Sequence, residues 1–217
     1  DDSFDVAISN VPFGNIPVHD PAFRKGRALL TRSVHNYFFA KTLDKLRPGG
    51  VLAFITSHNT LDAPKAEPVR EYLAEKADLL GAVRLPKGAF PDTDVVTDII
   101  YMRKRLPGQQ PGDRSWVKSR ELELEVGDGS YKRTVDVNGY FLDHPEQVLG
   151  KQSASGSMYG GDEYTVEPYK DKSLTPLLLY AVGKLPDHAI TEASADAGPR
   201  GAQTPSAANV KEAAYVI

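Results

Sequence analysis

Apolar and polar residues follow one another along residues 1–105 in blocks that are typical of an α/β fold. Four apolar runs predict strands, at residues 6–8, 51–56, 79–85 and 95–103, and the first two of these strands are expected to be buried. Over residues 29–46 and 68–76, apolar positions recur three and four apart, which predicts two helices between these strands. This order predicts a mostly parallel sheet in which the last strand is an antiparallel edge strand.

Beyond Lys104 the pattern weakens and predicts a small β-rich and irregular extension. Prolines and glycines over residues 106–113 predict a linker, and alternating apolar residues on either side of Gly127-Asp128-Gly129 predict an exposed hairpin. The later elements expected are a turn and short helix (138–149), a flexible run (153–161), a strand (164–166), a helix (175–184) and a linker or disordered tail from Pro186. We therefore expect three parts, at residues 1–105, 106–150 and 151–217.

The segment Asn10-Val11-Pro12-Phe13-Gly14 directly follows the first strand. It lies where the chain leaves the carboxyl end of the strand, which is where open α/β sheets bind ligands. Pro12 restricts Val11 to extended geometry and so gives the Val11 carbonyl a nearly fixed direction. Asn10 adds a side-chain oxygen and Phe13 an aromatic face, which together suit a planar base with an amino group. Asn, Pro and Gly are also common turn residues, so this pentapeptide alone is equally compatible with an ordinary turn.

Residues further along the chain favour the base-binding interpretation. Asn10–Gly14 resembles the Asn-Pro-Pro-Phe/Tyr catalytic loop of adenine-specific (N6) DNA methyltransferases, with Val11 in place of the first proline. Similarity to the corresponding parts of type I modification methylase subunits extends over residues 85–90 and 95–104, and over residues 37–41 together with 46–51. The likeness is nearest to large methylase–helicase proteins of phages, plasmids and other mobile elements. It covers residues 1–105 and implies the second half of a Rossmann-like methyltransferase domain.

The resemblance implies transfer of a methyl group from S-adenosylmethionine to the exocyclic amino group of adenine in DNA. It also implies a setting in a larger restriction-modification or anti-restriction protein with a linked helicase. In this family the Asn10 side chain and the Val11 carbonyl would accept the hydrogens of the amine, with Pro12 shaping the loop and Phe13 stacking on the base. Asn10 and Pro12 are also expected to contact the cofactor. The residues expected on the DNA side are Gly14, Arg24, Lys25, Arg27, His58 and Asn59.

The expected DNA-side residues also have simpler interpretations. The cluster Arg24-Lys25-Gly26-Arg27 can grip a phosphate backbone, although most such clusters are solvated surface. His58-Asn59 ends the second strand at the same edge as Asn10, and ordering the loop is a better expectation for this pair than acid–base chemistry. His35 lies among aromatic residues and is expected to serve packing.

Composition narrows the possible chemistry. The chain has no cysteine, which excludes disulfides, thiolate zinc sites and cysteine nucleophiles, and its five histidines lack ligand spacing, so no metal site is expected. No apolar run approaches a membrane span and no signal peptide is recognisable, so we expect a cytoplasmic protein. The net charge of −3 does not by itself favour nucleic acid, but residues 1–105 carry 15 Lys and Arg against 13 Asp and Glu, which permits a DNA partner.

The beginning of the chain bears on activity. It starts at Asp1 without a methionine, shortly before a strand, so we expect it to be part of a longer protein. The Gly-rich cofactor loop that this family carries earlier has no counterpart here, so the chain alone is expected to be inactive. Two alternatives remain open. One is a non-catalytic methylase-like module that positions a linked helicase or partner; the other is a protein-glutamine methyltransferase, against which the pattern of residues 85–104 argues.

Overall fold

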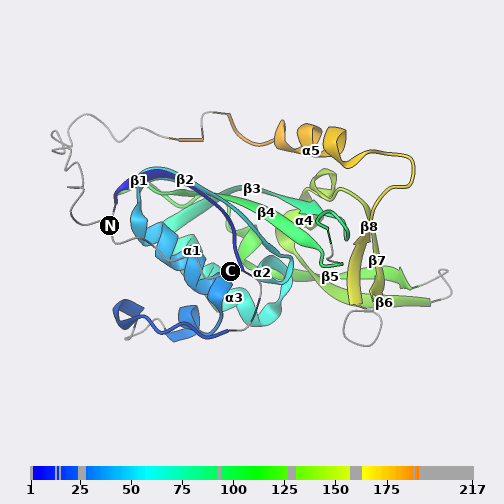
Figure 1. Ribbon diagram of the computed structural model, residues 1–217, viewed down its shortest axis with the longest axis horizontal. Coiled ribbons are helices and arrows are strands. Elements are labelled where there is room, and N and C mark those ends of the chain that lie inside the picture. The colour runs from blue at the N-terminus through cyan, green and yellow to red at the C-terminus, as the bar shows by residue number, and fades with distance from the viewer. Residues whose placement is uncertain are drawn as a thin grey trace.

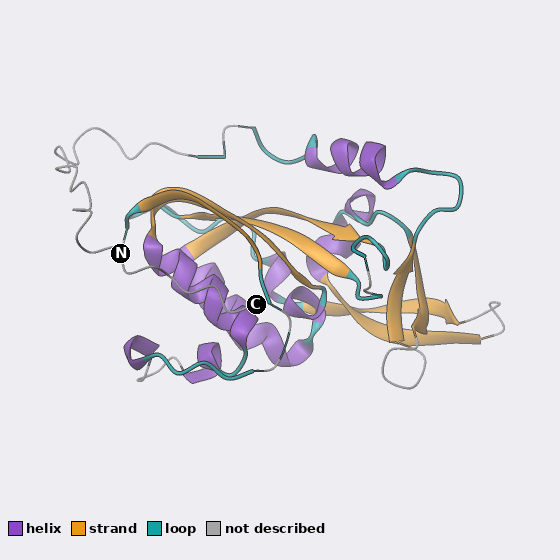
Figure 2. Cartoon of the chain, viewed as in Figure 1, coloured by secondary structure: helices purple, strands orange, loops and turns teal. Residues whose placement is uncertain are grey.

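A four-stranded mixed sheet forms the centre of the chain in the computed structural model (Figures 1 and 2). The structure describes residues 2–12, 14, 16–23, 28–91, 94–126, 131–156, 163–187 and 189–190. The strands are β1 (Phe4–Asn10), β2 (Leu46–Ser57), β3 (Ala77–Leu85) and β4 (Thr97–Lys104), arranged in the order β1-β2-β4-β3. The α/β fold class predicted from the sequence, with a sheet that contains an antiparallel strand, is confirmed.

The antiparallel strand occupies a different place from the one predicted. β1 runs parallel to β2, whereas β4 is antiparallel to both β2 and β3, with Ile99 opposite Ile55 and Val83. The antiparallel direction is therefore confirmed, but the edge position is wrong, because β4 is inserted between β2 and β3. Ile100 and Met102 are buried on one face of β4, and Ile99 on the other face packs against a second apolar cluster. A strand covered on both faces is favoured inside a sheet.

β1 is an edge strand with one open face, so the prediction that residues 6–8 are buried is wrong. Within the described residues β1 pairs only with β2. Phe4 and Val6 are half exposed and Ile8 is 80% exposed, whereas Ala7 faces the opposite way and packs against the core. An open apolar groove of about 510 Å³ runs along this face, lined by Val6, Ile8, Val51, Ala53, Tyr101, Ala189 and Ile190.

Two helices cover the other face of the sheet, as Figure 1 shows. α1 (Val34–Lys45) buries Phe39, Ala40 and Leu43, and the ring of Phe39 meets that of Phe54 on β2 edge to face at 5.1 Å. α3 (Glu67–Lys76) carries a proline in its first turn, where a missing N–H costs nothing. The single helix predicted over residues 29–46 is instead two elements, a 3-10 turn, η2 (Ala28–Thr31), and α1. Among the described helices, none has the length and apolar character needed to cross a membrane.

The second half of the chain adds two small hairpins that lie beside one another at one end of the sheet (Figure 1). Its elements are η4 (Ser115–Val117), β5 (Ser119–Val126), β6 (Tyr131–Asn138), α4 (Gly139–Asp143), β7 (Lys151–Gly156), β8 (Glu163–Glu167) and α5 (Leu174–Val182). The hairpin predicted around residues 127–129 is present as β5 and β6, and the predicted strand and late helix as β8 and α5. The predicted flexible run is wrong at residues 153–156, which belong to β7; residues 157–161 and the tail from 191 lie outside the described part.

The hairpins share an apolar core with the sheet. Trp116, Val137 and Phe141 are buried in the same cluster as Phe54 of β2 and Phe39 of α1. α5 packs on the other side of β3, where Ala181 joins a separate small cluster. This packing brings residues of the second half to the carboxyl edge of the sheet, where they contact the segment that follows β2 and the end of β3.

Candidate active site at the carboxyl edge of the sheet

The loop that follows β1 is held firmly at its start. Asn10 ends β1 opposite Ile55 of β2, and the Val11 amide N–H donates to the Ile55 carbonyl over 2.9 Å. The Val11 side chain is 1% exposed and lies in the main core. Valine therefore takes its fixed position from tertiary contacts, whereas a proline would take part of it from its own ring.

Two of the predicted catalytic residues face solvent at this edge. Asn10 and Pro12 are both exposed, so the Asn10 amide is accessible to a ligand that approaches the end of β1. Gly14 is partly buried and has a φ of +146°, a conformation that favours glycine. The remaining residues predicted near this loop, Phe13, Arg24, Lys25 and Arg27, lie outside the described residues.

His35 lies in the first turn of α1 and was expected only to pack. Its Nε2 lies 3.3 Å from Ser33 Oγ. Burial lowers the pKa of His35 below its ordinary value, the Gly14 backbone opposes this shift, and the charge of Lys65 adds to it.

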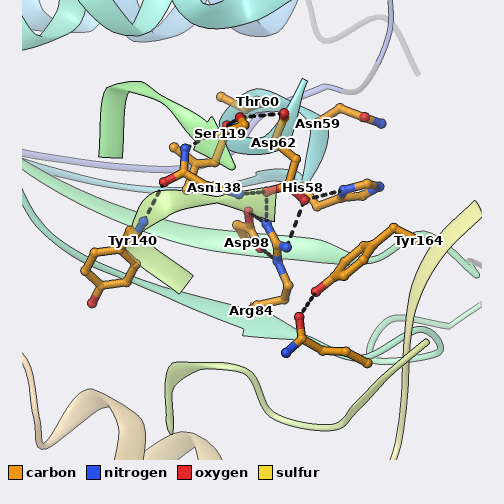
Figure 3. A network of polar contacts seen from close by, with 12 residues as sticks. His58, Asn59, Thr60, Asp62, Arg84, Asp98, Ser119, Asn138, Tyr140 and Tyr164 are labelled. Atoms are coloured by element: carbon orange, nitrogen blue, oxygen red, sulfur yellow. Dashed lines mark hydrogen bonds and ion pairs between the residues drawn. The ribbon is translucent and has the colours of Figure 1, made fainter. Parts of the chain in front are cut away.

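His58, predicted to lie on the DNA side, belongs to a buried polar network (Figure 3). It directly precedes α2 (Asn59–Asp62) at the end of β2, and its Nδ1 lies 3.0 Å from Asp62 Oδ2. Asp62 accepts from Arg84 Nη2 over 2.9 Å, and Arg84 in turn donates from Nε to Asp98 Oδ1 over 2.8 Å. Asn59 is exposed, and its side-chain amide donates to the nearby Ser57 hydroxyl, so the two predicted neighbours have different surroundings.

Residues of the second half complete this network. The Asn138 amide N–H donates to Asp62 Oδ1 over 2.8 Å, and its side chain donates to the carbonyls of Leu61 and Trp116. Ser119 donates to the Asp62 carbonyl over 2.7 Å. Figure 3 shows these side chains converging on Asp62 from the strand ends on one side and from the hairpin on the other.

Two aromatic rings enclose the guanidinium of Arg84. Its central carbon lies 4.0 Å from the centroid of Phe141 and 5.1 Å from that of Tyr164, which favours a cation between them. Tyr164 is also tilted against His58, with ring centroids 5.5 Å apart. Side chains from both halves of the chain therefore build and enclose the network.

Burial and charge act in opposite directions on the acidic groups. Burial would raise the pKa of Asp62, but Arg84 and His58 outweigh it and hold that pKa below the ordinary value. For Asp98 burial prevails, and its pKa is raised despite the contact with Arg84. Burial lowers the pKa of Arg84, but the charges of Asp62 and Asp98 more than offset this and raise it. Burial also raises the pKa of Tyr164 to about 12.

The sequence contains a local signal for this network. Arg84 is the single charge in the apolar run 79–85, and Asp98 is the single charge in the stretch 95–102. Burying a charge inside such a run is costly unless an opposite charge lies beside it, so each of these two residues predicts an opposite charge as its neighbour. Their register as opposed residues on β3 and β4 brings them together.

No group of three or more His, Asp or Glu in the described part is arranged to hold a metal ion. A Cβ on Gly50 would lie 2.9 Å from the Asp5 carbonyl, so this glycine permits the close approach of β1.

Comparison with known proteins assigns a family. The family profile described as N-6 DNA Methylase matches residues 1–119. The chain is 35% identical over 108 residues to the Defense against restriction protein B of Escherichia phage P1, covering 48% of this chain and 5% of that protein. It is 27% identical over 111 residues to the Type II methyltransferase M.CvrRI of Paramecium bursaria Chlorella virus XZ-6E, covering 50% and 28%. The chain thus spans only a small part of the relatives it matches.

Solved structures with related folds include two methyltransferases. A putative class I S-adenosylmethionine-dependent methyltransferase from Listeria monocytogenes matches at 22% identity with a TM-score of 0.43, over 52% of this chain and 35% of that one. The M protein of the type I restriction enzyme EcoKI matches at 23% identity with a TM-score of 0.37, over 52% and 23%. The family profile covers more than half of the chain, including the sheet and the loop after β1, and so the chain belongs to the N-6 DNA methylase family.

Proposed function

We propose that this chain forms the base-binding half of an adenine-N6 DNA methyltransferase site that uses S-adenosylmethionine. The observation that carries the proposal is the loop after β1, where Asn10 is exposed while Val11 is fixed by Ile55 and the core. The loop follows the carboxyl end of a strand, the ligand-binding edge of such sheets. The N-6 DNA Methylase family and a relative named as a methyltransferase support the same reaction.

The proposed chemistry concerns the exocyclic amine of adenine, a poor nucleophile because its lone pair is delocalised into the ring. In the proposal the Asn10 side-chain oxygen and the Val11 carbonyl accept its two hydrogens. These acceptors are preorganised and aligned, and they favour a more tetrahedral nitrogen whose lone pair can attack the methyl group. The cofactor, when bound, supplies the methyl group. Pro12 limits the loop geometry, and Phe13 stacks on a base that has left the duplex.

The proposed DNA contacts surround this loop. We assign Gly14, Asn59 and the basic residues Arg24, Lys25 and Arg27 to the DNA side, with His58 ordering the end of β2 through Asp62. The proposed cofactor contacts are Asn10 and Pro12. Since one relative is a phage protein named for defence against restriction, we also propose a cytoplasmic restriction-modification or anti-restriction setting, with further domains such as a helicase in the same protein.

Methyl transfer to DNA tests the proposal. The polypeptide is expressed as it is encoded, complete at both ends, and incubated with tritiated S-adenosylmethionine and duplex DNA. We expect label in N6-methyladenine after digestion of the DNA, and a loss of about 10²–10³-fold in Asn10→Ala. Thr134→Ala, an equally small change at an exposed position on β6, is the matched control and should keep full activity. Full activity in a folded Asn10→Ala protein contradicts the proposal.

A non-catalytic module is the second candidate, because Val11 replaces a proline and Gly50 serves packing rather than cofactor binding. The same assay separates the candidates. Cofactor-independent DNA or partner binding without any labelled product favours the non-catalytic module. Label in methylglutamine of a protein substrate, with none in DNA, indicates a protein-glutamine methyltransferase.

A further inference from the structure

The two ring nitrogens of His58 have different surroundings. Nδ1 lies 3.0 Å from Asp62 Oδ2. Nε2 has no hydrogen-bond partner within the described part of the chain, and it is not one of the buried unpaired atoms there, so it reaches solvent. The whole side chain is 17% exposed. In Figure 3 the ring points away from Arg84, towards the same side of the network as Asn59.

The carboxylate of Asp62 decides which nitrogen of His58 carries the proton. Arg84 Nη1 lies 2.8 Å from the same Oδ2 that faces the histidine. Asp62 Oδ1 accepts from Arg84 Nη2 over 2.9 Å and from the Asn138 N–H over 2.8 Å. Guanidinium and amide N–H groups only donate, so both oxygens of Asp62 are acceptors. Nδ1 is therefore the donor to Asp62, and in the neutral ring Nε2 is left as an acceptor.

The second half of the chain holds this ring in place. Tyr164 lies against it, with ring centroids 5.5 Å apart, and the His58 backbone N–H donates to the Val96 carbonyl over 3.1 Å. Asn138 and Tyr164 both lie beyond residues 1–119, the part that the family profile matches. The orientation of His58 thus depends on a segment that the family profile does not cover.

His58 lies at the edge of the sheet where the target base is proposed to bind. Asn10 ends β1 opposite Ile55 of the parallel strand β2, and His58 directly follows the end of β2. A neutral acceptor does not bind phosphate oxygens, which also only accept, so its partner must supply an N–H group. The major groove of DNA presents such groups as the amines of adenine and cytosine. Both hydrogens of the target amine are already assigned to Asn10 and Val11, so the partner of Nε2 belongs to another base.

We propose that His58 is a specificity-determining residue, whose Nε2 accepts a hydrogen bond from the amino group of an adenine or cytosine that flanks the target adenine. Asp62 orients this acceptor. Arg84 and Asn138 hold Asp62, and Tyr164 supports the ring. The inference rests on the proposed function and goes beyond it, because it assigns to the end of β2 a choice of DNA sequence rather than the ordering of a loop.

Two variants separate the two nitrogens of His58. His58→Asn places an amide N–H near the position of Nδ1, which keeps the bond to Asp62 but removes the Nε2 acceptor. His58→Gln brings an amide oxygen near the position of Nε2. The complete polypeptide is incubated with S-adenosylmethionine and a pool of duplexes randomised around a central adenine, and the methylated duplexes are sequenced.

We expect the wild type to prefer adenine or cytosine at one flanking position by about 10–100-fold. His58→Gln should keep most of this preference, whereas His58→Asn should lose it while it still methylates the pool. A residue that only orders the loop through Asp62 would give the opposite ranking. His144→Asn, at an exposed histidine 3.4 Å from Glu146, is the matched control and should keep the wild-type preference.

A measurement on the ring itself does not depend on catalysis. ¹⁵N NMR of the folded chain at mildly alkaline pH should show a proton on Nδ1 of His58 and none on Nε2, and a proton on Nε2 overturns the inference. So does an unchanged preference in His58→Asn, or a loss in His58→Gln equal to that in His58→Asn, in variants that urea denaturation shows to be folded. If the wild type transfers no methyl group, the proposed function fails instead, and sequencing of the duplexes that bind the chain decides the inference by the same comparison.

Discussion

Arg84 and Asp98 form an ion pair that is closed to solvent, with Arg84 Nε 2.8 Å from Asp98 Oδ1 and no exposed area on either side chain. They are opposed residues on β3 and β4, so the sheet register itself brings them together. Asp62 adds a second carboxylate, and Asn138 links that carboxylate to the hairpin. The pair thus lies at the junction between the sheet and the second half of the chain (Figure 3).

Removal of the Arg84 charge should strongly destabilise the fold. In Arg84→Met the carboxylates of Asp62 and Asp98 remain buried without their counter-charge, so we expect a loss of about 3–5 kcal/mol in unfolding free energy. Urea denaturation of the 217-residue chain measures it. Combining Arg84→Met with Asp62→Asn and Asp98→Asn should recover part of the loss. Lys132→Met, which breaks an exposed ion pair with Glu123, should leave the midpoint of urea denaturation unchanged. A midpoint of Arg84→Met equal to that of the wild type would contradict this reading.

Gly150 should tolerate no side chain. Gly150 directly precedes β7, and a Cβ at this position would lie 2.3 Å from the carbonyl of Glu167, the last residue of β8. Because a backbone oxygen cannot move aside cheaply, we expect Gly150→Ala to lower stability by about 1–3 kcal/mol, as overpacking usually does. Thermal unfolding followed by circular dichroism measures the change. At Gly112 the nearest atoms are 3.5 Å away, so Gly112→Ala should be nearly neutral, and equal effects of the two variants would argue against the crowding.

His35 should make stability depend on pH in the mildly acidic range. Burial, aided by Lys65, lowers its pKa below the ordinary value of about 6.5, although the Gly14 backbone opposes this shift. As pH falls below about 6.5 the unfolded chain binds a proton at His35 before the folded chain does, so unfolding becomes easier until the folded pKa is reached. The unfolding free energy of the wild type minus that of His35→Leu should therefore be larger at pH 7.5 than at pH 5. Chemical denaturation at both values tests this, and a constant difference would show that His35 does not titrate differently on folding.

Tyr164 should contribute a loss of stability in alkali. Its hydroxyl bonds to Gln152 Oε1 over 2.9 Å, and burial raises its pKa to about 12, against about 10 in an unfolded chain. Its contribution is fully present below pH 10 and is lost as pH rises towards 12, by at most about 2–3 kcal/mol. Tyr164→Phe should remove this part of the decline between pH 8 and pH 11 in denaturant titrations. Tyr131→Phe, at a half-exposed position, is the control, and identical declines in both variants would refute the assignment.

Much of the fold could be predicted because its signals are local. The apolar runs at 51–56 and 79–85 and the helical spacing over 68–76 each reflect which face of one element is buried, and all three elements are present. The order of the strands could not be read in this way. Whether β4 lies at an edge or between β2 and β3 depends on which strands pair, and residues far apart in the chain decide that.

The candidate site divides in the same manner. The pentapeptide Asn10–Gly14 is contiguous, so its residue types and its place after a strand were visible in the sequence. The contact that holds its start comes from elsewhere, from Ile55 of β2. The pairing of β1 with β2 brings the Val11 N–H to the Ile55 carbonyl, and that pairing joins residues far apart in the sequence.

By itself the sequence determined where strands and helices form and which residues lie at the end of β1, since these depend on neighbours within a few positions. Only the tertiary structure decided that β1 is an open edge, that Arg84 meets Asp62 and Asp98, and that the Val11 N–H reaches the Ile55 carbonyl. The physical reason is the range of the interactions. Propensity and amphipathic spacing act along the chain, whereas strand pairing, ion pairing and loop anchoring join residues that are close in space only after the chain has folded.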